Sequence, residues 1–216
     1  MENAIKLIPR KLRNTALDIG SGFGFFTKVA IENGFDVTAI NPSRWENDVF
    51  EQMNGFRPIE KFIEDVELDK EFDLIIMSQV LEHLNDIDNI LKKTKSWMTE
   101  NGVLVIALPN IDSFSVKLFG TRDNSCLWVP EHLNYFSKKG LITLLNRLGF
   151  RVLRYQQISR IPYNFLSARL GLSRCNTLRK MCDKTVQIIQ KPILKIVDTL
   201  GLGLYHNIWV GHAVRE

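Results

Sequence analysis

Residues 14 to 24 read NTALDIGSGFG, and this stretch decides the fold. Residues 14 to 19 predict a short strand that runs directly into a loop with three alternating glycines. Phe25 to Asn33 carries apolar residues at helical spacing and stops before Gly34, so the loop joins a strand to a helix. Glycines tolerate tight turns and positive φ, which lets the backbone approach a ligand closely. Taken alone, the loop fits dinucleotide-binding folds as well.

Strands and helices are expected to alternate beyond this loop. The expected strands are Phe35 to Ile40, a short one near Pro58 to Phe62, Phe72 to Met77 and Gly102 to Leu108. One expected helix begins after an N-cap at Ser43 and ends at about Met53, and another runs from Asn85 to Thr99. The two later strands are almost continuously apolar, as in strands buried on both faces of a parallel sheet. The pattern predicts an α/β fold with an open, doubly wound sheet covered by helices on both faces.

The C-terminal part continues this pattern and adds a long insertion. Ser137 to Leu148 predicts a capped helix, and Phe150 to Ile158 and the last ten residues predict strands. Between these strands, residues 159–205 have helical spacing with Lys and Arg interspersed, so we expect a lid, an oligomer interface, a membrane-surface element or an extra helical layer. No linker composition divides the chain, and residues 1–216 are expected to form a single domain.

Composition narrows the location and the partners. The N-terminus lacks the apolar stretch of a secretory signal and no long apolar run occurs, so the protein is expected to be cytoplasmic. The net charge of +4 hides an asymmetry, because ten Lys and Arg against three acidic residues follow from Arg154 onward. Such a basic segment suits nucleic acid, an anionic membrane surface, a phosphorylated acceptor or a solvated helical face. Three cysteines without a Cys-x-x-Cys pair indicate neither a disulfide framework nor a zinc ribbon.

Two features separate the glycine loop from dinucleotide-binding loops. Asp18 stands at the end of the first strand, where a carboxylate can engage an ammonium group but would sit badly beside a pyrophosphate. The block FDLIIMSQVLEHL at residues 72–84 is the second. With these motifs the sequence resembles class I S-adenosylmethionine-dependent methyltransferases. The stretch EHLNYFSKKGLITLLNRLGFRV at residues 131–152 is similar to the branch with ubiquinone-biosynthesis and sugar-modifying enzymes.

The resemblance implies S-adenosylmethionine as the cofactor and a Rossmann-like, seven-stranded, mostly parallel sheet of order 3-2-1-4-5-7-6 with an antiparallel last strand. Residues 159–205 then become a helical insertion between the sixth and seventh strands. The implied cofactor-binding residues are Asp18, Gly20, Ser21, Gly22, Phe23, Gly24, Asn41, Pro42, Glu64, Ser78 and Gln79. Asn41 stands where the family has an acidic residue for the ribose, and it lacks the charge for that pairing. Glu64, with Asp65 as the alternative, matches the family's adenine-contacting acid.

His132 is the leading candidate for a base that accepts the proton of a hydroxyl acceptor, with Glu131 and Tyr135 as alternatives. Glu82 and His83 are expected to cap a helix and to support neighbouring site residues, with a catalytic role as the alternative. The sequence indicates no metal site, although a group of Cys126, His132 and Cys182 is conceivable. The phenylalanines at 23, 25 and 26 are expected to pack in the core, with stacking on the cofactor as the alternative.

The predicted reaction is methyl transfer to a hydroxyl of a small-molecule or glycan-like acceptor, such as a quinone or a nucleotide- or lipid-linked sugar. Residues 159–205 are expected to make a peripheral contact with an anionic membrane. Aromatic residues between Asn110 and Phe136 suit a pocket for such a ring. A non-catalytic cofactor-binding scaffold is one alternative. A second is an NAD-dependent oxidoreductase, which shares the glycine loop. No nucleic-acid substrate is expected, because the Asn/Asp-Pro-Pro-Tyr/Phe type motif is missing.

Overall fold

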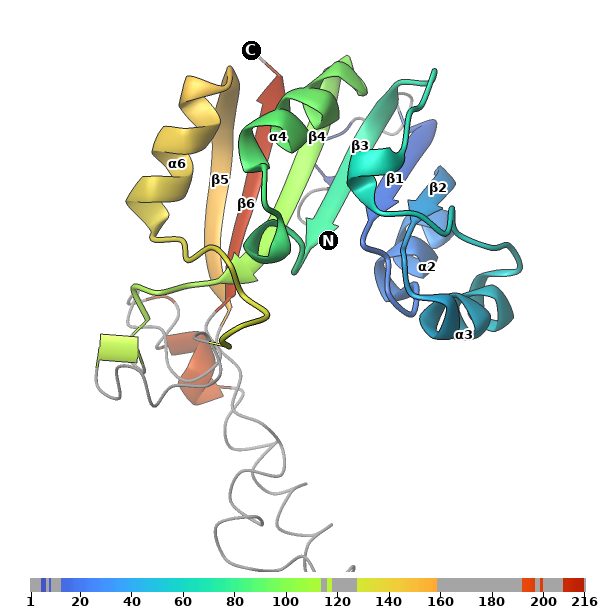
Figure 1. Ribbon diagram of the computed structural model, residues 1–216. Coiled ribbons are helices and arrows are strands. Elements are labelled where there is room, and N and C mark those ends of the chain that lie inside the picture. The colour runs from blue at the N-terminus through green and yellow to red at the C-terminus, as the bar shows by residue number, and fades with distance from the viewer. Residues whose placement is uncertain are drawn as a thin grey trace, which may run out of the picture.

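A six-stranded sheet forms the centre of the part of the chain that the structure describes. The computed structural model describes residues 5, 6, 8, 13–113, 116–117, 128–158, 192–196, 199 and 208–215. The strands are β1 (Thr15–Ile19), β2 (Asp36–Ile40), β3 (Phe72–Ser78), β4 (Met98–Pro109), β5 (Phe150–Ile158) and β6 (Ile208–Arg215). Their order is β2-β1-β3-β4-β6-β5, and β6 is antiparallel to both of its neighbours (Figure 1). The predicted α/β, Rossmann-like class is confirmed.

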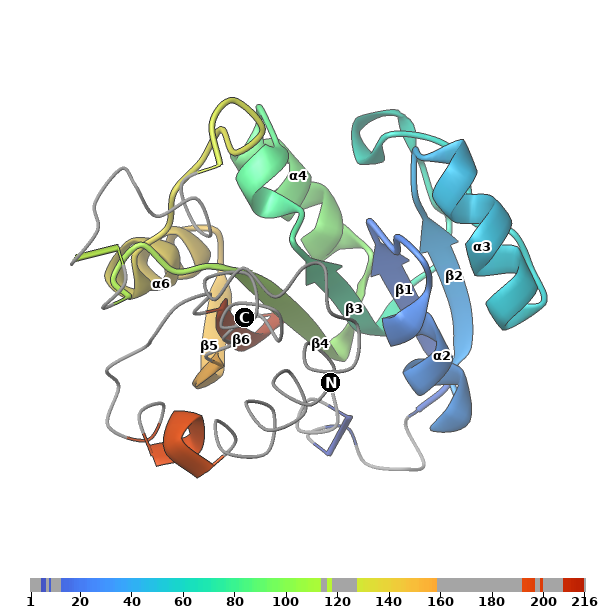
Figure 2. The same ribbon diagram turned by 90° about the horizontal axis from the view of Figure 1, so that it is seen from below.

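Helices cover both faces of this sheet. Alternate side chains of the buried strands point to opposite faces, so two apolar clusters form. One cluster joins the sheet to α4 (Ile87–Ser96) and α6 (Lys138–Arg147), and the other joins it to α2 (Phe25–Glu32). Figure 2 shows α4 and α6 on one side of the sheet and α2 on the other. Phe72, Phe150 and Leu17 are among the fully buried side chains.

Side-chain caps fix where the helices begin. The Ser43 hydroxyl accepts from the backbone N–H of Glu46 at the start of α3 (Arg44–Asn54), and the Ser137 hydroxyl caps α6 in the same way. Both predicted caps are confirmed. The helix expected from Asn85 is shorter, because Asp86 caps α4 and a separate 3-10 turn, η3 (Leu81–His83), precedes it.

The strand expected near Pro58 to Phe62 is not formed among the described residues. A single parallel bridge between Ile40 and Ile59 takes its place. Pro58 has no backbone N–H to donate, and the 3-10 turn η2 (Ile63–Asp65) starts a few residues later, so the segment cannot extend a ladder.

The predicted insertion lies almost entirely outside the described residues. Of residues 159–205 the structure describes 192–196, which are helical, and Thr199. Among the described helices, none has the length and apolar character needed to cross a bilayer.

The parallel strands bring their carboxyl ends to one edge of the sheet. Ile19 at the end of β1 pairs with Ile40 of β2 and with Met77 of β3, and Met77 pairs with Ile106 of β4. Loops that follow these strands therefore emerge side by side, along the lower edge of the sheet in Figure 1. In an open α/β sheet this edge is where ligands bind.

Candidate active site

The glycine loop folds back over the end of the neighbouring strand. The backbone N–H groups of Gly20 and Ser21 both donate to the carbonyl of Ile40, with N···O distances of 2.8 and 3.1 Å. Gly24 then donates to the Ser21 carbonyl at 2.8 Å, closing a tight turn at the start of α2. The loop is thereby held at the carboxyl edge.

The three glycines of the loop have different surroundings. A Cβ on Gly20 would lie 2.5 Å from Cγ2 of Val80, and one on Gly24 would lie 2.2 Å from Nδ2 of Asn54. These two glycines make room for other parts of the protein. A Cβ on Gly22, whose φ is 50°, would meet no atom of the described residues within 4 Å. Gly22 is thus the position where the backbone borders open space that a ligand can enter.

Asp18 lies at the end of β1 and is almost completely buried. Its carboxylate accepts a hydrogen bond from the hydroxyl of Thr27 on α2, at 2.6 Å. Burial raises the pKa of Asp18 from 3.8 to about 7, although the hydrogen bonds from Thr27 act in the opposite direction. A cationic group beside this carboxyl would favour its ionised form, so the site suits a ligand with an ammonium group.

Ser21 is a second buried polar residue of the loop. Its hydroxyl oxygen makes no hydrogen bond in the described structure. Buried hydroxyls are nearly always hydrogen-bonded in folded proteins. Ser21 directly precedes Gly22 in the chain, so this oxygen is a candidate partner for a polar group of a ligand bound at the loop.

The aromatic residues after the loop correct a prediction. Phe25 is 63% exposed and Phe26 is 39% exposed, so neither is part of the core. Both stand in the first turn of α2, whose buried residues are Thr27 and Ala30. Phe23 is half-buried and meets the ring of Trp45 edge-on, with centroids 5.4 Å apart.

Asn41 belongs to a polar network at the start of α3. It is buried, and its Nδ2 donates to Oδ1 of Asn47 at 3.0 Å and to Oε2 of Glu46 at 3.1 Å. Asn47 in turn donates to the backbone oxygen of Asn41. Glu46 therefore places a half-buried carboxylate next to the position where the sequence lacks an acidic residue. Sequence reasoning missed Glu46, although its place three residues after the predicted N-cap Ser43 is a signal for a carboxylate at the start of this helix.

The remaining predicted cofactor residues lie along the same edge with different exposure. Pro42 and Glu64 are exposed, Glu64 on the η2 turn. Ser78 ends β3 and is half-buried. Gln79 follows with a φ of 59°, and both its backbone N–H and its side-chain amide donate to the Ala107 carbonyl, at 2.7 and 3.2 Å. These two hydrogen bonds hold Gln79 in a conformation that is unusual for a residue with a side chain.

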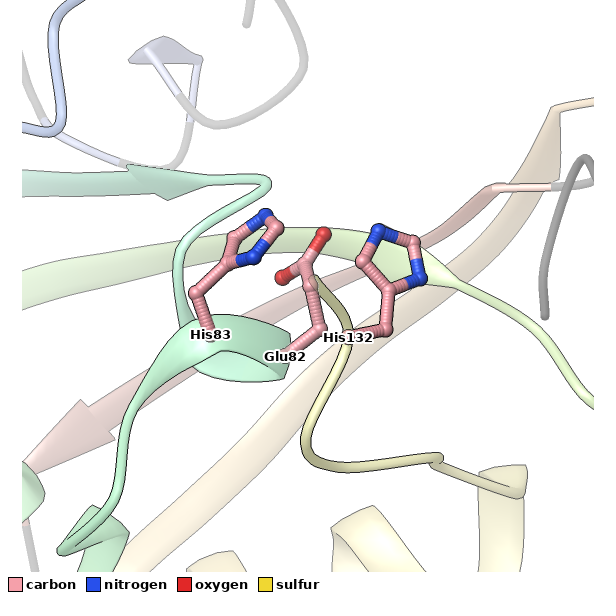
Figure 3. A group of neighbouring side chains, drawn as sticks. All are labelled: Glu82, His83 and His132. Carbon is pink, nitrogen blue, oxygen red and sulfur yellow. The ribbon is translucent and has the colours of Figure 1, made fainter. Parts of the chain in front are cut away.

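His132 is brought together with Glu82 and His83. One ligand atom from each of the three lies within 4.8 Å of the others, and Figure 3 shows the Glu82 carboxylate between the two rings. The ring centroids of His83 and His132 are 5.0 Å apart. Burial raises the pKa of Glu82 to about 7. The expectation that Glu82 and His83 cap a helix is wrong, because Asp86 caps α4 and η3 has no side-chain cap.

Backbone hydrogen bonds dock the loop that carries His132 onto η3. The N–H groups of Leu133 and Asn134 both donate to the Glu82 carbonyl, at 2.7 and 3.0 Å. The side-chain amide of Asn134 donates to the Leu84 carbonyl at 2.6 Å. These contacts join segments that are about fifty residues apart. Because Val80 packs against Gly20, the cluster lies at the same edge as the glycine loop.

Comparison with known proteins identifies the fold and the family. A family model described as a methyltransferase domain matches residues 2–155, most of the chain. The chain belongs to the methyltransferase-domain family. The family predicted from the loop and from residues 72–84 is thereby confirmed, and this favours a methyltransferase over the oxidoreductase alternative.

This methyltransferase-domain chain has curated relatives and solved neighbours. The ubiquinone biosynthesis O-methyltransferase of Rickettsia prowazekii is 29% identical over 129 residues, which cover 56% of this chain and 51% of the relative. The chain therefore spans about half the length of the curated relatives that it matches.

Two solved structures share the fold. An S-adenosylmethionine-dependent methyltransferase from Mesorhizobium loti superposes with a TM-score of 0.66 at 15% identity, covering 99% of this chain and 96% of that one. The magnesium protoporphyrin IX methyltransferase from Synechocystis, solved with bound S-adenosylmethionine, has a TM-score of 0.58 at 12% identity, with 100% and 77% of the two chains covered.

Proposed function

We propose that this protein transfers the methyl group of S-adenosylmethionine to a hydroxyl of a small-molecule or glycan-like acceptor. The observation that carries the proposal is the open space at Gly22, in the same loop as the buried carboxyl of Asp18 and the unpartnered hydroxyl of Ser21. Membership of the methyltransferase-domain family supplies the expected cofactor. Its ammonium group and its hydroxyls suit these two buried polar side chains.

The cofactor is expected to lie along the carboxyl edge. In our proposal the loop Gly20 to Gly24 approaches its amino-acid part, Asp18 engages the ammonium group, and Ser78 and Gln79 close over the same part. Asn41 and Pro42 lie at the ribose, with Glu46 supplying the negative charge that Asn41 lacks. The exposed Glu64 contacts the adenine.

The reaction needs an acceptor oxygen placed in line behind the methyl group. The sulfonium already activates the methyl, so the protein's part is alignment and exclusion of water. As the new carbon–oxygen bond forms, the carbon–sulfur bond breaks, a neutral thioether leaves and the hydroxyl gives up its proton. We place His132 next to that oxygen, because it lies beside Glu82 and His83 at the same edge as the loop.

The acceptor is proposed at the level of its chemical class. The ubiquinone biosynthesis relatives and the aromatic residues between Asn110 and Phe136 favour a ring-bearing hydroxyl compound, such as a quinol or a sugar. The basic segment 159–205 favours an acceptor that is phosphorylated or linked to a lipid carrier at an anionic membrane. No nucleic acid is expected among the partners.

The finer sheet arrangement belongs to the same proposal. We infer that the sheet is the seven-stranded order 3-2-1-4-5-7-6 with its outermost strand shortened to the bridge between Ile40 and Ile59. The six observed strands follow that order, and the chain between β5 and β6 is long enough for the expected helical insertion.

Calorimetry with S-adenosylmethionine and S-adenosylhomocysteine tests the cofactor. The wild type should bind both, and Asp18→Ala should bind at least tenfold more weakly. If the folded wild type binds neither, the proposed function is wrong. A screen of quinols and nucleotide sugars for methyl transfer then tests catalysis. His132→Ala should lose turnover and keep S-adenosylhomocysteine affinity, whereas binding without turnover of any acceptor would favour the scaffold alternative.

A further inference from the structure

The carboxylate of Glu82 is buried and has no hydrogen-bond partner among the described residues. The residue is 1% exposed, and the lack of a partner applies to both carboxylate oxygens. An ionised carboxylate buried without a partner is strongly unfavourable, and such groups in proteins are paired or bind a metal ion. None of the described Lys or Arg side chains forms an ion pair with it.

Two imidazole rings complete a set of metal-ligating side chains around this carboxylate. A nitrogen of His83, a nitrogen of His132 and an oxygen of Glu82 lie within 4.8 Å of one another (Figure 3). Ligand atoms about 2.1 Å from a divalent ion lie roughly 3 to 4 Å apart, so the three need to close by only about 1 Å. Two histidines and one carboxylate are a ligand set that leaves further positions on the ion open.

The protein orients these ligands through a second layer of contacts. Nδ1 of His83 lies 2.7 Å from the backbone oxygen of Glu131. A carbonyl only accepts, so Nδ1 carries the proton and Nε2 keeps the lone pair with which imidazole binds a metal. Metal-ligating histidines commonly donate their other N–H to a carbonyl in this way. The Glu82 carbonyl, held by Leu133 and Asn134, fixes the third ligand's backbone.

From this arrangement, we propose that Glu82, His83 and His132 bind a divalent first-row transition ion, such as Zn²⁺ or Mn²⁺. Of these two ions Zn²⁺ is the better match to two nitrogen ligands, whereas Mg²⁺ prefers a set of oxygen ligands. The inference rests on the proposed function and deepens it. An acceptor hydroxyl that takes an open position on the ion ionises more easily and passes its proton to solvent, and His132 then acts as a ligand instead of a base. The acceptor class is thereby narrowed to molecules whose reacting oxygen can ligate a metal.

The test uses the full chain without a histidine tag, stripped of metal with a chelator. Calorimetric titrations with Zn²⁺, Mn²⁺ and Mg²⁺ and the absorption spectrum with Co²⁺ measure binding. Glu82→Gln and His132→Asn should weaken transition-metal binding at least tenfold. Glu100→Gln, a change to an exposed glutamate on β4, should leave it unchanged. At a hundredfold excess over Kd, metal should raise the unfolding midpoint of the wild type by roughly 5 to 10 °C.

Folding of the variants is controlled in the metal-free state. Glu82→Gln removes a carboxyl whose ionisation is opposed by burial, so above pH 7 its midpoint without metal should equal or exceed that of the wild type. The metal site is overturned if the wild-type protein binds none of the transition ions, or if it binds Mg²⁺ as tightly as it binds them. It is also overturned if the folded Glu82→Gln variant binds the transition ions as tightly as the wild type does. S-adenosylhomocysteine is titrated in parallel: metal binding without cofactor binding would overturn the proposed function and leave the metal site standing.

Discussion

A single methyl group added at Gly22 separates ligand binding from folding. Within the part of the chain that the structure describes, the Cβ of Gly22→Ala meets no atom within 4 Å. Gly24→Ala is the matched variant in the same loop, because its Cβ would lie 2.2 Å from Nδ2 of Asn54 and 2.6 Å from the ring of Phe50. Both glycines have positive φ, 50° and 83°, so the backbone cost is shared.

The expected magnitudes follow from these contacts. A left-handed backbone costs alanine roughly 1–2 kcal/mol in either variant. Overpacking adds about 1–3 kcal/mol at Gly24 alone, so Gly24→Ala should lose roughly 2–5 kcal/mol of unfolding free energy. Gly22→Ala should lose only the roughly 1–2 kcal/mol of unfolding free energy that the left-handed backbone costs. Its methyl group enters the space proposed for the cofactor, and a steric cost of ~1–3 kcal/mol there weakens binding by about 5- to 150-fold.

Urea unfolding and calorimetry with S-adenosylhomocysteine measure the two effects on the same preparations. Gly22→Ala should be the more stable of the two variants and should still bind S-adenosylhomocysteine poorly. Wild-type affinity in Gly22→Ala would refute the assignment of the open space to the cofactor. Equal stability of the two variants would refute the packing argument for Gly24.

Four further outcomes follow from other contacts. The affinity for S-adenosylmethionine should rise as the pH rises through about 7, because a bound cation lowers the raised pKa of Asp18. This pH dependence should be reduced in Asp18→Asn, and calorimetry across this range measures it. Without ligand, the folded chain holds the Asp18 proton more tightly than the unfolded chain, so urea unfolding should give a free energy that falls from pH 4 to about 7, with that slope reduced in Asp18→Asn. Thr27→Val removes the 2.6 Å hydrogen bond to Asp18 and should cost about 1–3 kcal/mol in urea unfolding. Phe72→Ala, at a fully buried position, should cost about 3–5 kcal/mol in the same assay, whereas Phe62→Ala, 63% exposed, should cost about 0.5 kcal/mol or less.

Much of the fold could be predicted because its signals are local. The apolar runs at Phe72 to Met77 and Gly102 to Leu108 lie within β3 and β4, and Ser43 and Ser137 cap the predicted helices. The strand near Pro58 was overpredicted, because the local residue pattern does not weigh a missing backbone N–H against the ladder. The exposure of Phe25 was missed, because helical spacing does not tell which side chains of α2 the sheet covers.

The sequence by itself determined the loop, the strand order along the chain and the family, since glycine spacing and apolar periodicity are properties of neighbouring residues. Only the tertiary structure decided that Gly22 faces open space while Gly20 and Gly24 pack against protein. It also brought His132 beside Glu82 through hydrogen bonds between segments far apart in the chain. Such contacts depend on how β3, η3 and a distant loop are placed together, and no local pattern carries that information.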